Sequence, residues 1–399
     1  MQPVELRPSI YWVGVNDRQT DLFEGLWTIR KEGISYNSYL INDRKKLIID
    51  LSSKSTTDEL LNQVQNFFDP SELDYLVINH LEPDHSGALK TFIRLAPKLK
   101  LIGTAKTKEM LQSFYDITEN IQVVTEGEEL DLGEHRLKFM LTPFVHWPET
   151  MMTYEMTQKI LFSCDGFGCY GALNGTIYDD KTTRLAWYES QALRYFVNIV
   201  ASYSKPVKNA IAKIEKYPLE IVAPSHGLIW RANPYHIIEL YNQWADYANK
   251  AGDPAVTIIY ASMYGNTERI MEAVAQGIVD EGVPISIYNV SRDSTSEILP
   301  SLWLKRGVMV GAPTYEGKLF VDMVNLLEMA RRKHIFQKIC AGFGSHAWMG
   351  GGQRELNEYM DTLRWKQFGN FEFEGAASSQ EISEARQFGA DFAREILSG

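Results

Sequence analysis

Four side chains that bind metals well stand close together in the segment from residue 79 to residue 85, Asn-His-Leu-Glu-Pro-Asp-His. The apolar run 73–80 leads into this segment and predicts a strand. Pro83 and Gly87 predict that the segment itself is a loop. Only 8 of the 399 residues are histidine, so chance explains the cluster poorly and a metal site explains it well. The four side chains are His80, Glu82, Asp84 and His85.

Three more residues of ligand type end other predicted strands. His146 follows the run 135–143, while Asp165 and His226 end their own strand-like runs. A lone histidine is more often a satisfied polar residue than a ligand. Here half of the histidines, with three carboxylates, stand at strand ends or in strand-end loops, and loops at one edge of a sheet converge in space. We therefore expect all seven side chains to meet in one metal site.

The type of metal follows from the donor set of four imidazoles and three carboxylates, with no thiolate. Seven ligands exceed what one tetrahedral ion needs and suit two ions that share a carboxylate. Three carboxylates contribute −3, two divalent ions +4 and one bridging hydroxide −1, so the site is neutral, as a buried pocket requires. Nitrogen and oxygen donors favour iron or manganese somewhat more than zinc, but charge alone leaves a dizinc site open.

These residues resemble the metallo-β-lactamase-like domain of the flavodiiron proteins, also called A-type flavoproteins. The segments His146-Trp147-Pro148 and 223–230 (Ala-Pro-Ser-His-Gly-Leu-Ile-Trp) match that family too. Hydrolases of this fold carry a second histidine where this chain has Glu82, and the substitution is the mark of iron. The resemblance implies no catalytic residue beyond the ligands. It assigns His80, Glu82 and His146 to one iron, Asp84, His85 and His226 to the other, and Asp165 to the bridge.

A hydroxyl-rich loop at 262–267 lies between an apolar run, 255–261, and a predicted helix, 266–281. Such a loop can wrap a phosphate with backbone N–H groups at the helix start, although a plain N-cap explains it equally well. It contains neither the dinucleotide fingerprint nor the nucleotide P-loop, so a phosphate monoester is the better interpretation. Loops 312–317 and 343–348 follow strands at the same sheet edge and offer aromatic rings for a flat cofactor.

Residues 255–399 resemble flavodoxin, which implies bound FMN. The third loop departs from the common Gly-Ser-Tyr-Gly-Trp form at His346 and Ala347, and this departure concerns the redox tuning and stacking of the flavin. The resemblance implies contacts to FMN from Ser262, Met263, Tyr264, Gly265, Asn266, Thr267, Pro313, Thr314, Tyr315, Glu316, Gly317, Gly344, Ser345, His346, Ala347 and Trp348.

The elements that position these residues indicate two domains. The first half is rich in short apolar runs, and regular strand–helix alternation begins after the Ala-Gly-Asp-Pro stretch at 251–254. We expect an α/β protein, with a metallo-β-lactamase-like αββα sandwich over 1–250 and a flavodoxin-like doubly wound parallel sheet over 255–399. Beyond the first strand of the second half the sequence predicts strands 284–290, 307–313 and 338–345, a polar connection before 307, and helices 319–332, 352–364 and 380–397.

Composition excludes several classes of protein. Forty Lys and Arg against 51 Asp and Glu give a net charge of −11, which argues against nucleic-acid binding. The first residues show no signal peptide, and no apolar run approaches the ~18 residues of a membrane span, so we expect a cytoplasmic protein with no membrane partner. Three cysteines make a disulfide framework improbable, and no CxxC pair supplies a rubredoxin centre.

Flavodiiron proteins reduce dioxygen to water or nitric oxide to nitrous oxide, and we expect the same here in a minimal two-domain member. The resemblance implies a head-to-tail homodimer, or a dimer of dimers, that sets the flavin of one chain beside the irons of the other. It also implies an external electron donor such as rubredoxin or a reduced deazaflavin coenzyme. Two alternatives stay open: a dizinc hydrolase of the same fold fused to a flavodoxin domain, and an electron carrier with a vestigial metal loop.

Overall fold

The computed structural model describes residues 1–398, and the chain divides into two units, Met1–Ala245 and a second that begins at Asp246. The division falls shortly before the Ala-Gly-Asp-Pro stretch at which the sequence changes character. The domain limits 1–250 and 255–399 stay a prediction. Each unit contains its own sheets and helices and is described by itself.

Two sheets form the centre of the first unit. The larger has seven strands in the order β1-β2-β7-β8-β9-β10-β11, and the smaller has five in the order β12-β13-β14-β15-β16. Every residue of β14 and β15 is buried, which shows that both faces of the smaller sheet are covered. The strands are β1 (Val4–Arg7), β2 (Ile10–Trp12), β7 (Tyr39–Asn42), β8 (Lys46–Ile49), β9 (Tyr75–Val77), β10 (Lys100–Gly103), β11 (Ile121–Val123), β12 (Glu129–Asp131), β13 (Arg136–Leu141), β14 (Met151–Glu155), β15 (Ile160–Cys164) and β16 (Ile221–Pro224).

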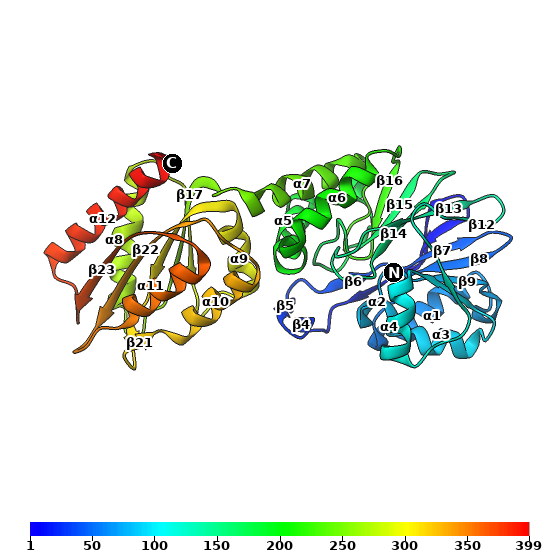
Figure 1. Cartoon of the computed structure of the whole chain (residues 1–399), viewed down its shortest axis with the longest axis horizontal. Helices are drawn as coiled ribbons and strands as arrows, with labels where there is room; N and C mark the ends of the chain where they lie inside the picture. Colours follow the sequence, from blue (N-terminus) through cyan, green and yellow to red (C-terminus); the bar gives the residue numbers. More distant parts are fainter. Residues whose placement is uncertain (399) are drawn as a thin grey trace. The chain divides into compact units, whose positions relative to one another are not determined.

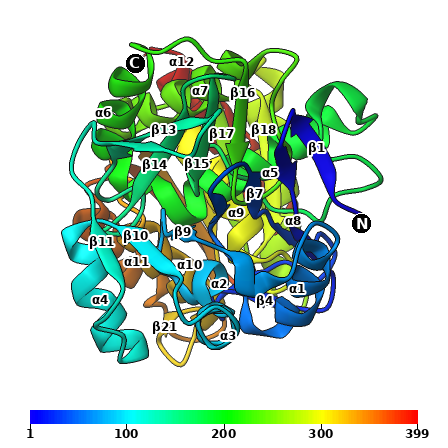
Figure 2. The ribbon, with the colours of Figure 1, turned by 90° about the vertical axis from the view of Figure 1, so that its right-hand side faces the viewer.

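Helices cover the outer face of each sheet and complete the expected αββα sandwich. In Figures 1 and 2, α1, α3 and α4 lie beyond the seven-stranded sheet, and α6 and α7 lie beyond the five-stranded one. Their buried residues recur at helical spacing, as in α6, where Val207, Ala210, Ile211 and Ile214 face the core. The helices are α1 (Thr57–Gln65), α2 (Pro83–Ser86), α3 (Leu89–Leu95), α4 (Ala105–Tyr115), α5 (Leu185–Tyr195), α6 (Ser204–Ile214) and α7 (Pro234–Asp246).

Smaller elements complete the first unit. The apolar run 9–15 (Ser-Ile-Tyr-Trp-Val-Gly-Val) is divided between two strands, and an added Cβ on Gly14 in the break would lie 2.5 Å from the Tyr36 carbonyl oxygen. A π-helical turn continues α5 at Phe196–Val200. The paired strands are β3 (Val15–Asp17) with β6 (Ile34–Tyr36) and β4 (Leu22–Phe23) with β5 (Trp27–Thr28), and the 3₁₀ turns lie at Lys54–Thr56, Pro70–Glu72, Asp179–Lys181 and Ala201–Tyr203.

The second unit contains one parallel sheet of five strands in the order β18-β17-β19-β22-β23, the doubly wound arrangement expected from the sequence. Helices α8 and α12 pack on one face around a core that includes Ile258, Phe343 and Phe392. Figure 1 shows α9 and α10 on the other side of the sheet. The elements are β17 (Asp253–Tyr260), α8 (Asn266–Asp280), β18 (Ile285–Asn289), α9 (Thr295–Leu304), β19 (Lys305–Gly311), β20 (Thr314–Tyr315), β21 (Lys318–Leu319), α10 (Val321–Arg332), β22 (Ile339–His346), α11 (Gly352–Leu363), β23 (Lys366–Glu374) and α12 (Ser379–Ser398), after a 3₁₀ turn at Tyr247–Asn249.

Three local predictions were wrong. The loop expected at the metal segment contains the short helix α2, because proline is favoured in the first turn of a helix, and Pro83 begins it. The polar connection before 307 contains α9, which starts at a capping box between Ser294 and Glu297. The sequence also missed β23, an edge strand that contains three charged residues and a glycine among its aromatic ones.

Candidate metal centre and flavin pocket

The ligand-type side chains of the first unit emerge at the carboxyl ends of four strands. His80 follows β9, His146 follows β13, Asp165 directly follows β15, and His226 follows β16. Glu82 immediately precedes α2, and the other two residues lie within that helix. The structure therefore brings all seven predicted residues to one place, although they span 146 positions of the chain, from 80 to 226.

Asp165 lies at the centre of this cluster. Its Oδ2 lies 3.4 Å from His80 Nε2 and 3.3 Å from His146 Nε2. Its Oδ1 lies 3.1 Å from His85 Nε2 and 3.3 Å from His226 Nε2. Each oxygen of one carboxylate thus faces a different pair of imidazoles, which is the arrangement that a bridging ligand needs.

A further carboxylate accompanies each pair of imidazoles. Glu82 Oε2 lies 3.2 Å from Nε2 of both His80 and His146. Asp84 Oδ2 lies 3.4 Å from His85 Nε2 and 3.3 Å from His226 Nε2. Donor atoms with this spacing can all lie about 2.1 Å from one cation between them. The cluster therefore has two sets of donors that share Asp165.

Several of these donor atoms are buried without a hydrogen-bond partner. They are both carboxylate oxygens of Asp84, Oδ2 of Asp165, and Nε2 of His85 and His226. Burying polar atoms without a partner costs several kcal/mol, roughly 2 to 7 for each group. Cations at the two positions would satisfy these atoms together, so the residues fit a dinuclear metal centre.

Hydrogen bonds on the far side of the rings orient two of the imidazoles. His226 Nδ1 lies 2.7 Å from the backbone oxygen of Ser35, and His80 Nδ1 lies 2.6 Å from Glu149 Oε1. In each case the ring N–H on Nδ1 donates outward, which turns Nε2 toward the centre, where its lone pair can bind a cation once Nε2 has lost its proton. Tyr195 O–H donates to Asp165 Oδ1 at 3.0 Å and holds the shared carboxylate.

Opposite charges in the cluster shift the pKa values of its members. Burial favours the neutral form of Glu82, but hydrogen bonds from His146 and His80 lower its pKa to about 2. Burial likewise disfavours charged imidazoles, but the negative carboxylate of Asp165, 3.3 Å from each ring, raises the pKa of His146 to about 9 and that of His226 to about 10. Without a cation, both imidazoles therefore hold protons at neutral pH.

We expect metal binding to release protons from this centre. A cation needs the Nε2 lone pair, so at pH 7 each ion must displace protons from imidazoles such as His146 and His226. Apparent affinity should rise with pH until about pH 9 to 10, above which these imidazoles are already neutral. The pKa values of His80 and His85 are raised as well, so titration calorimetry of metal-free protein with iron(II), in buffers of different ionisation enthalpy, should show release of at least two protons at pH 7. Heats that do not depend on the buffer would contradict this.

The sequence did not single out three residues that complete the centre. Glu149 directly follows the segment His146-Trp147-Pro148, and this closeness to a ligand in the sequence was the one feature that could have indicated its role. Tyr195 and Ser35 had no local signal, because their contacts join segments 30 and 191 residues apart. Cys164 also approaches His85 and Asp165, but burial raises the pKa of its thiol well above the ordinary value. Without a cation, the thiol of Cys164 is therefore neutral.

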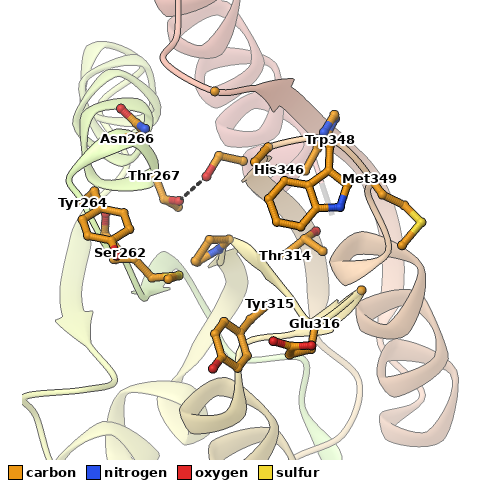
Figure 3. A pocket seen from close by; sticks show the side chains of 16 residues that line it. Ser262, Tyr264, Asn266, Thr267, Thr314, Tyr315, Glu316, His346, Trp348 and Met349 are labelled. Atoms are coloured by element: carbon orange, nitrogen blue, oxygen red, sulfur yellow. Dashed lines mark hydrogen bonds between the residues drawn. The ribbon is translucent and has the colours of Figure 1, made fainter.

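A pocket of about 500 Å³ lies at the carboxyl ends of β17, β19 and β22 in the second unit (Figure 3). Fourteen of the sixteen residues predicted to contact a flavin line it, all except Gly265 and Gly344. The sequence missed Met349 and Gly375, which line it as well.

Gly265 and Gly344, the two predicted residues that do not line the pocket, occupy backbone positions that favour glycine. Gly265 has φ +90° immediately before α8, a conformation that other residues rarely adopt. A Cβ on Gly344 would lie 2.0 Å from the Ala312 carbonyl oxygen, so only glycine allows β22 to approach that loop.

The first loop of this pocket is arranged around the start of α8. Ser262 Oγ accepts hydrogen bonds from the N–H groups of Gly265 at 3.1 Å and Glu268 at 3.4 Å. Thr267 Oγ1 lies 3.1 Å from Ser345 Oγ and ties the first loop to the third, as Figure 3 shows. Among the described residues no lysine or arginine lines the pocket, so hydroxyl and backbone donors are what it offers a phosphate.

Aromatic side chains and one unpaired polar atom complete the fit to a flat heteroaromatic cofactor. Tyr264 and Trp348 are each 88% exposed, an unusual state for such large rings. The pocket volume falls within the usual range for cofactor sites, roughly 300 to 1,000 Å³. His346 Nδ1 is buried without a hydrogen-bond partner. A bound flavin would cover the rings and supply polar atoms.

We expect the second unit to bind FMN by itself. All lining residues lie between Ser262 and Gly375, and the parallel sheet has its own core. A fragment from Asp246 onward should bind FMN and be reducible in the absence of iron. Absorbance and flavin fluorescence during titration with FMN measure this. A folded fragment that ignores added FMN would refute it.

Comparison with known proteins finds a family match for each half of the chain. Residues 34–227 match the family model of the ODP family beta lactamase, and residues 258–389 match that of flavodoxin. The chain is 33% identical to the anaerobic nitric oxide reductase flavorubredoxin of Salmonella typhi over 98% of this chain and 82% of that protein.

Solved structures show the same similarity across both units. Rubredoxin oxygen:oxidoreductase from the anaerobe Desulfovibrio gigas has a TM-score of 0.93 and 26% identity, over 100% of this chain and 99% of that one. A variant of the flavo di-iron protein from Thermotoga maritima has a TM-score of 0.88 and 28% identity, over 99% and 98%. Separately, none of the helices in residues 1–398 has the length and hydropathy needed to cross a membrane.

Proposed function

Because the chain belongs to the flavodiiron protein family, we propose that it is an oxidoreductase that reduces dioxygen to water, nitric oxide to nitrous oxide, or both. The reaction takes place at two non-haem iron ions, and FMN delivers the electrons. The observation that carries this proposal is Asp165, whose two oxygens face two separate sets of buried donors.

We assign the ligands of the two ions by these sets. The two groups of donors that lie within reach of one another support the assignment. Each ion then has two imidazoles and one carboxylate of its own, and the third carboxylate is common to both. One ion would be held by His80, Glu82 and His146, the other by Asp84, His85 and His226, and Asp165 would be shared by both.

The residues around the centre orient its ligands and exclude water. When bound, the iron pair supplies two electrons and a place for the gas to react, and FMN supplies two more electrons. Ser35 and Glu149 hold imidazole rings by their Nδ1 atoms, and Tyr195 holds the shared carboxylate. Phe23 packs edge-on against His226 at 5.5 Å and Trp147 against His80 at 5.1 Å, so apolar rings wall the donors on both sides.

We further propose that the three loops of the second unit bind FMN. The start of α8 and the hydroxyls of Ser262 and Thr267 suit the phosphate, while Tyr315 and Trp348 suit the flavin ring. The proposed contact residues are the sixteen predicted from the sequence, together with Met349 and Gly375.

Electrons must enter from outside and reach the irons from the flavin. We propose an external donor, a rubredoxin or a reduced deazaflavin coenzyme, since the Desulfovibrio relative is named for rubredoxin. We also propose a head-to-tail homodimer, or a dimer of dimers, in which electrons pass from the FMN of one chain to the irons of another.

Metal analysis and gas turnover of the purified protein test the function directly. We expect two iron ions and one FMN per chain, and consumption of dioxygen or nitric oxide with a reduced rubredoxin as donor. Side-by-side rates with the two gases establish the preference. Two zinc ions without iron would favour the hydrolase alternative. Bound iron without turnover of either gas would overturn the proposed reaction.

A further inference from the structure

Glu149 is a buried carboxylate with a single charged partner. Its side chain and that of His80 are both 0% exposed. Its Oε1 lies 2.6 Å from His80 Nδ1 and accepts a hydrogen bond from the Leu81 N–H at 3.0 Å. Its Oε2 is buried without a partner. Within residues 1–398 no lysine or arginine forms an ion pair with Glu149, so the His80 ring and the Leu81 N–H are the groups that stabilise its charge.

We propose that Glu149 is a positioning residue that fixes His80 as a ligand and lends its negative charge to one side of the dinuclear centre. This inference rests on the proposed metal centre. The carboxylate holds the proton of His80 on Nδ1, which keeps the Nε2 lone pair directed at the ion. Carboxylates in this position raise the basicity of a ligating imidazole.

The same carboxylate shapes the chain between two ligands of one ion. Leu81 stands between His80 and Glu82, and its N–H points at Glu149 Oε1. One oxygen therefore anchors both the imidazole and the backbone that leads to the next ligand. Removing this oxygen would free both the orientation of the His80 ring and the backbone conformation at Leu81.

The two sides of the centre differ in this respect. The ring of His226 donates to the backbone oxygen of Ser35, which is a neutral acceptor, while the ring of His80 donates to a carboxylate. Counting Glu149 with the three ligand carboxylates gives −4, which balances two divalent ions at +4 without a hydroxide. The additional negative charge of Glu149 favours the more oxidised state of the metal pair, and it acts mainly on the ion that His80 would bind.

Glu149→Gln removes the negative charge of this side chain and keeps its size and shape. A glutamine oxygen can still accept from His80 and Leu81, but the negative charge is gone. We expect iron(II) to bind the metal-free variant about 10- to 100-fold more weakly in competition with a chelator. We also expect a 10- to 100-fold shift of a one-electron step toward the reduced pair, about 60 to 120 mV more positive. Spectroelectrochemistry under argon measures the potential.

Glu155→Gln is the matched control. Glu155 is also 0% exposed and also pairs with a histidine, His135 Nδ1 at 3.3 Å, but it is not part of the metal cluster. Both variants replace a buried glutamate, Glu149 just before β14 and Glu155 at the end of β14, so both should lose some thermal stability. Only Glu149→Gln should change the iron affinity and the potential.

Different outcomes separate this inference from the proposed function. Wild-type protein that binds no iron would overturn both. Wild-type affinity and potential in Glu149→Gln, with iron bound normally to the wild type, would overturn the role of Glu149 alone. If Glu149→Gln does not fold, Glu149→Asp replaces it, because the shorter side chain withdraws the oxygen from Nδ1. Its iron affinity should fall at least about fivefold, and an unchanged affinity would refute the proposal.

Discussion

Asp165→Asn should abolish gas reduction and remove most of the iron while FMN stays bound. The substitution exchanges one carboxylate oxygen for an NH₂ group, which cannot bind a cation and would face a pair of imidazole Nε2 atoms. It also removes one of the three ligand charges that balance the two ions. Residues that only hydrogen-bond to ligands already change affinity about 10- to 100-fold, so we expect at least a hundredfold loss of turnover. Iron analysis, flavin absorbance and gas consumption measure the three effects.

Asp179→Asn is a suitable control for this substitution. Asp179 is also a buried carboxylate of the first unit, and it accepts hydrogen bonds from the N–H groups of Arg231 and Ala232. It should affect stability without affecting iron or turnover. Full iron content and wild-type turnover in Asp165→Asn would count decisively against the bridging assignment.

Two inactive chains should restore activity when they are combined, if electrons cross between chains. One chain would carry His226→Ala, which removes a donor from the proposed second ion. The other would carry Thr267→Ala with Trp348→Ala, which removes a hydroxyl and a ring from the flavin pocket. In a closed symmetric dimer, one of the two flavin–iron pairs then joins intact partners, and neither mutant homodimer contains such a pair. Activity should reach up to about half of the wild-type value per dimer.

Co-expression with two different affinity tags isolates the mixed dimer for this measurement. Its FMN content should be about half of the wild-type value, and its iron content about half to three quarters, because His226→Ala removes a donor from one of the two ions in that chain. A mixed dimer that is as inactive as the two mutant homodimers would show that electrons do not cross the interface. Full activity in either mutant homodimer would show that its lesion does not disable the site.

The sequence was least informative where an element depends on its partners in the fold. In β23 (Lys366–Glu374), aromatic residues alternate with glutamates only over 371–374, and the strand forms because its backbone pairs with β22. Helix α9 has a weak apolar periodicity and contains Pro300. Its capping box was visible in the sequence, but the polar residues before it indicated a connection.

The amino-acid sequence by itself determined the residue types and where along the chain they stand. The sequence placed four histidines and three carboxylates at strand ends, and three loops after parallel strands. These positions could be predicted because hydrophobic periodicity and turn residues are properties of short segments. Only the tertiary structure decided which atoms meet. It gives each oxygen of Asp165 its own pair of imidazoles, places Glu149 behind His80 and sets Tyr195 against Asp165. These contacts join residues 19 to 85 positions apart, and packing between the two sheets and their helices creates them, so no local pattern could reveal them.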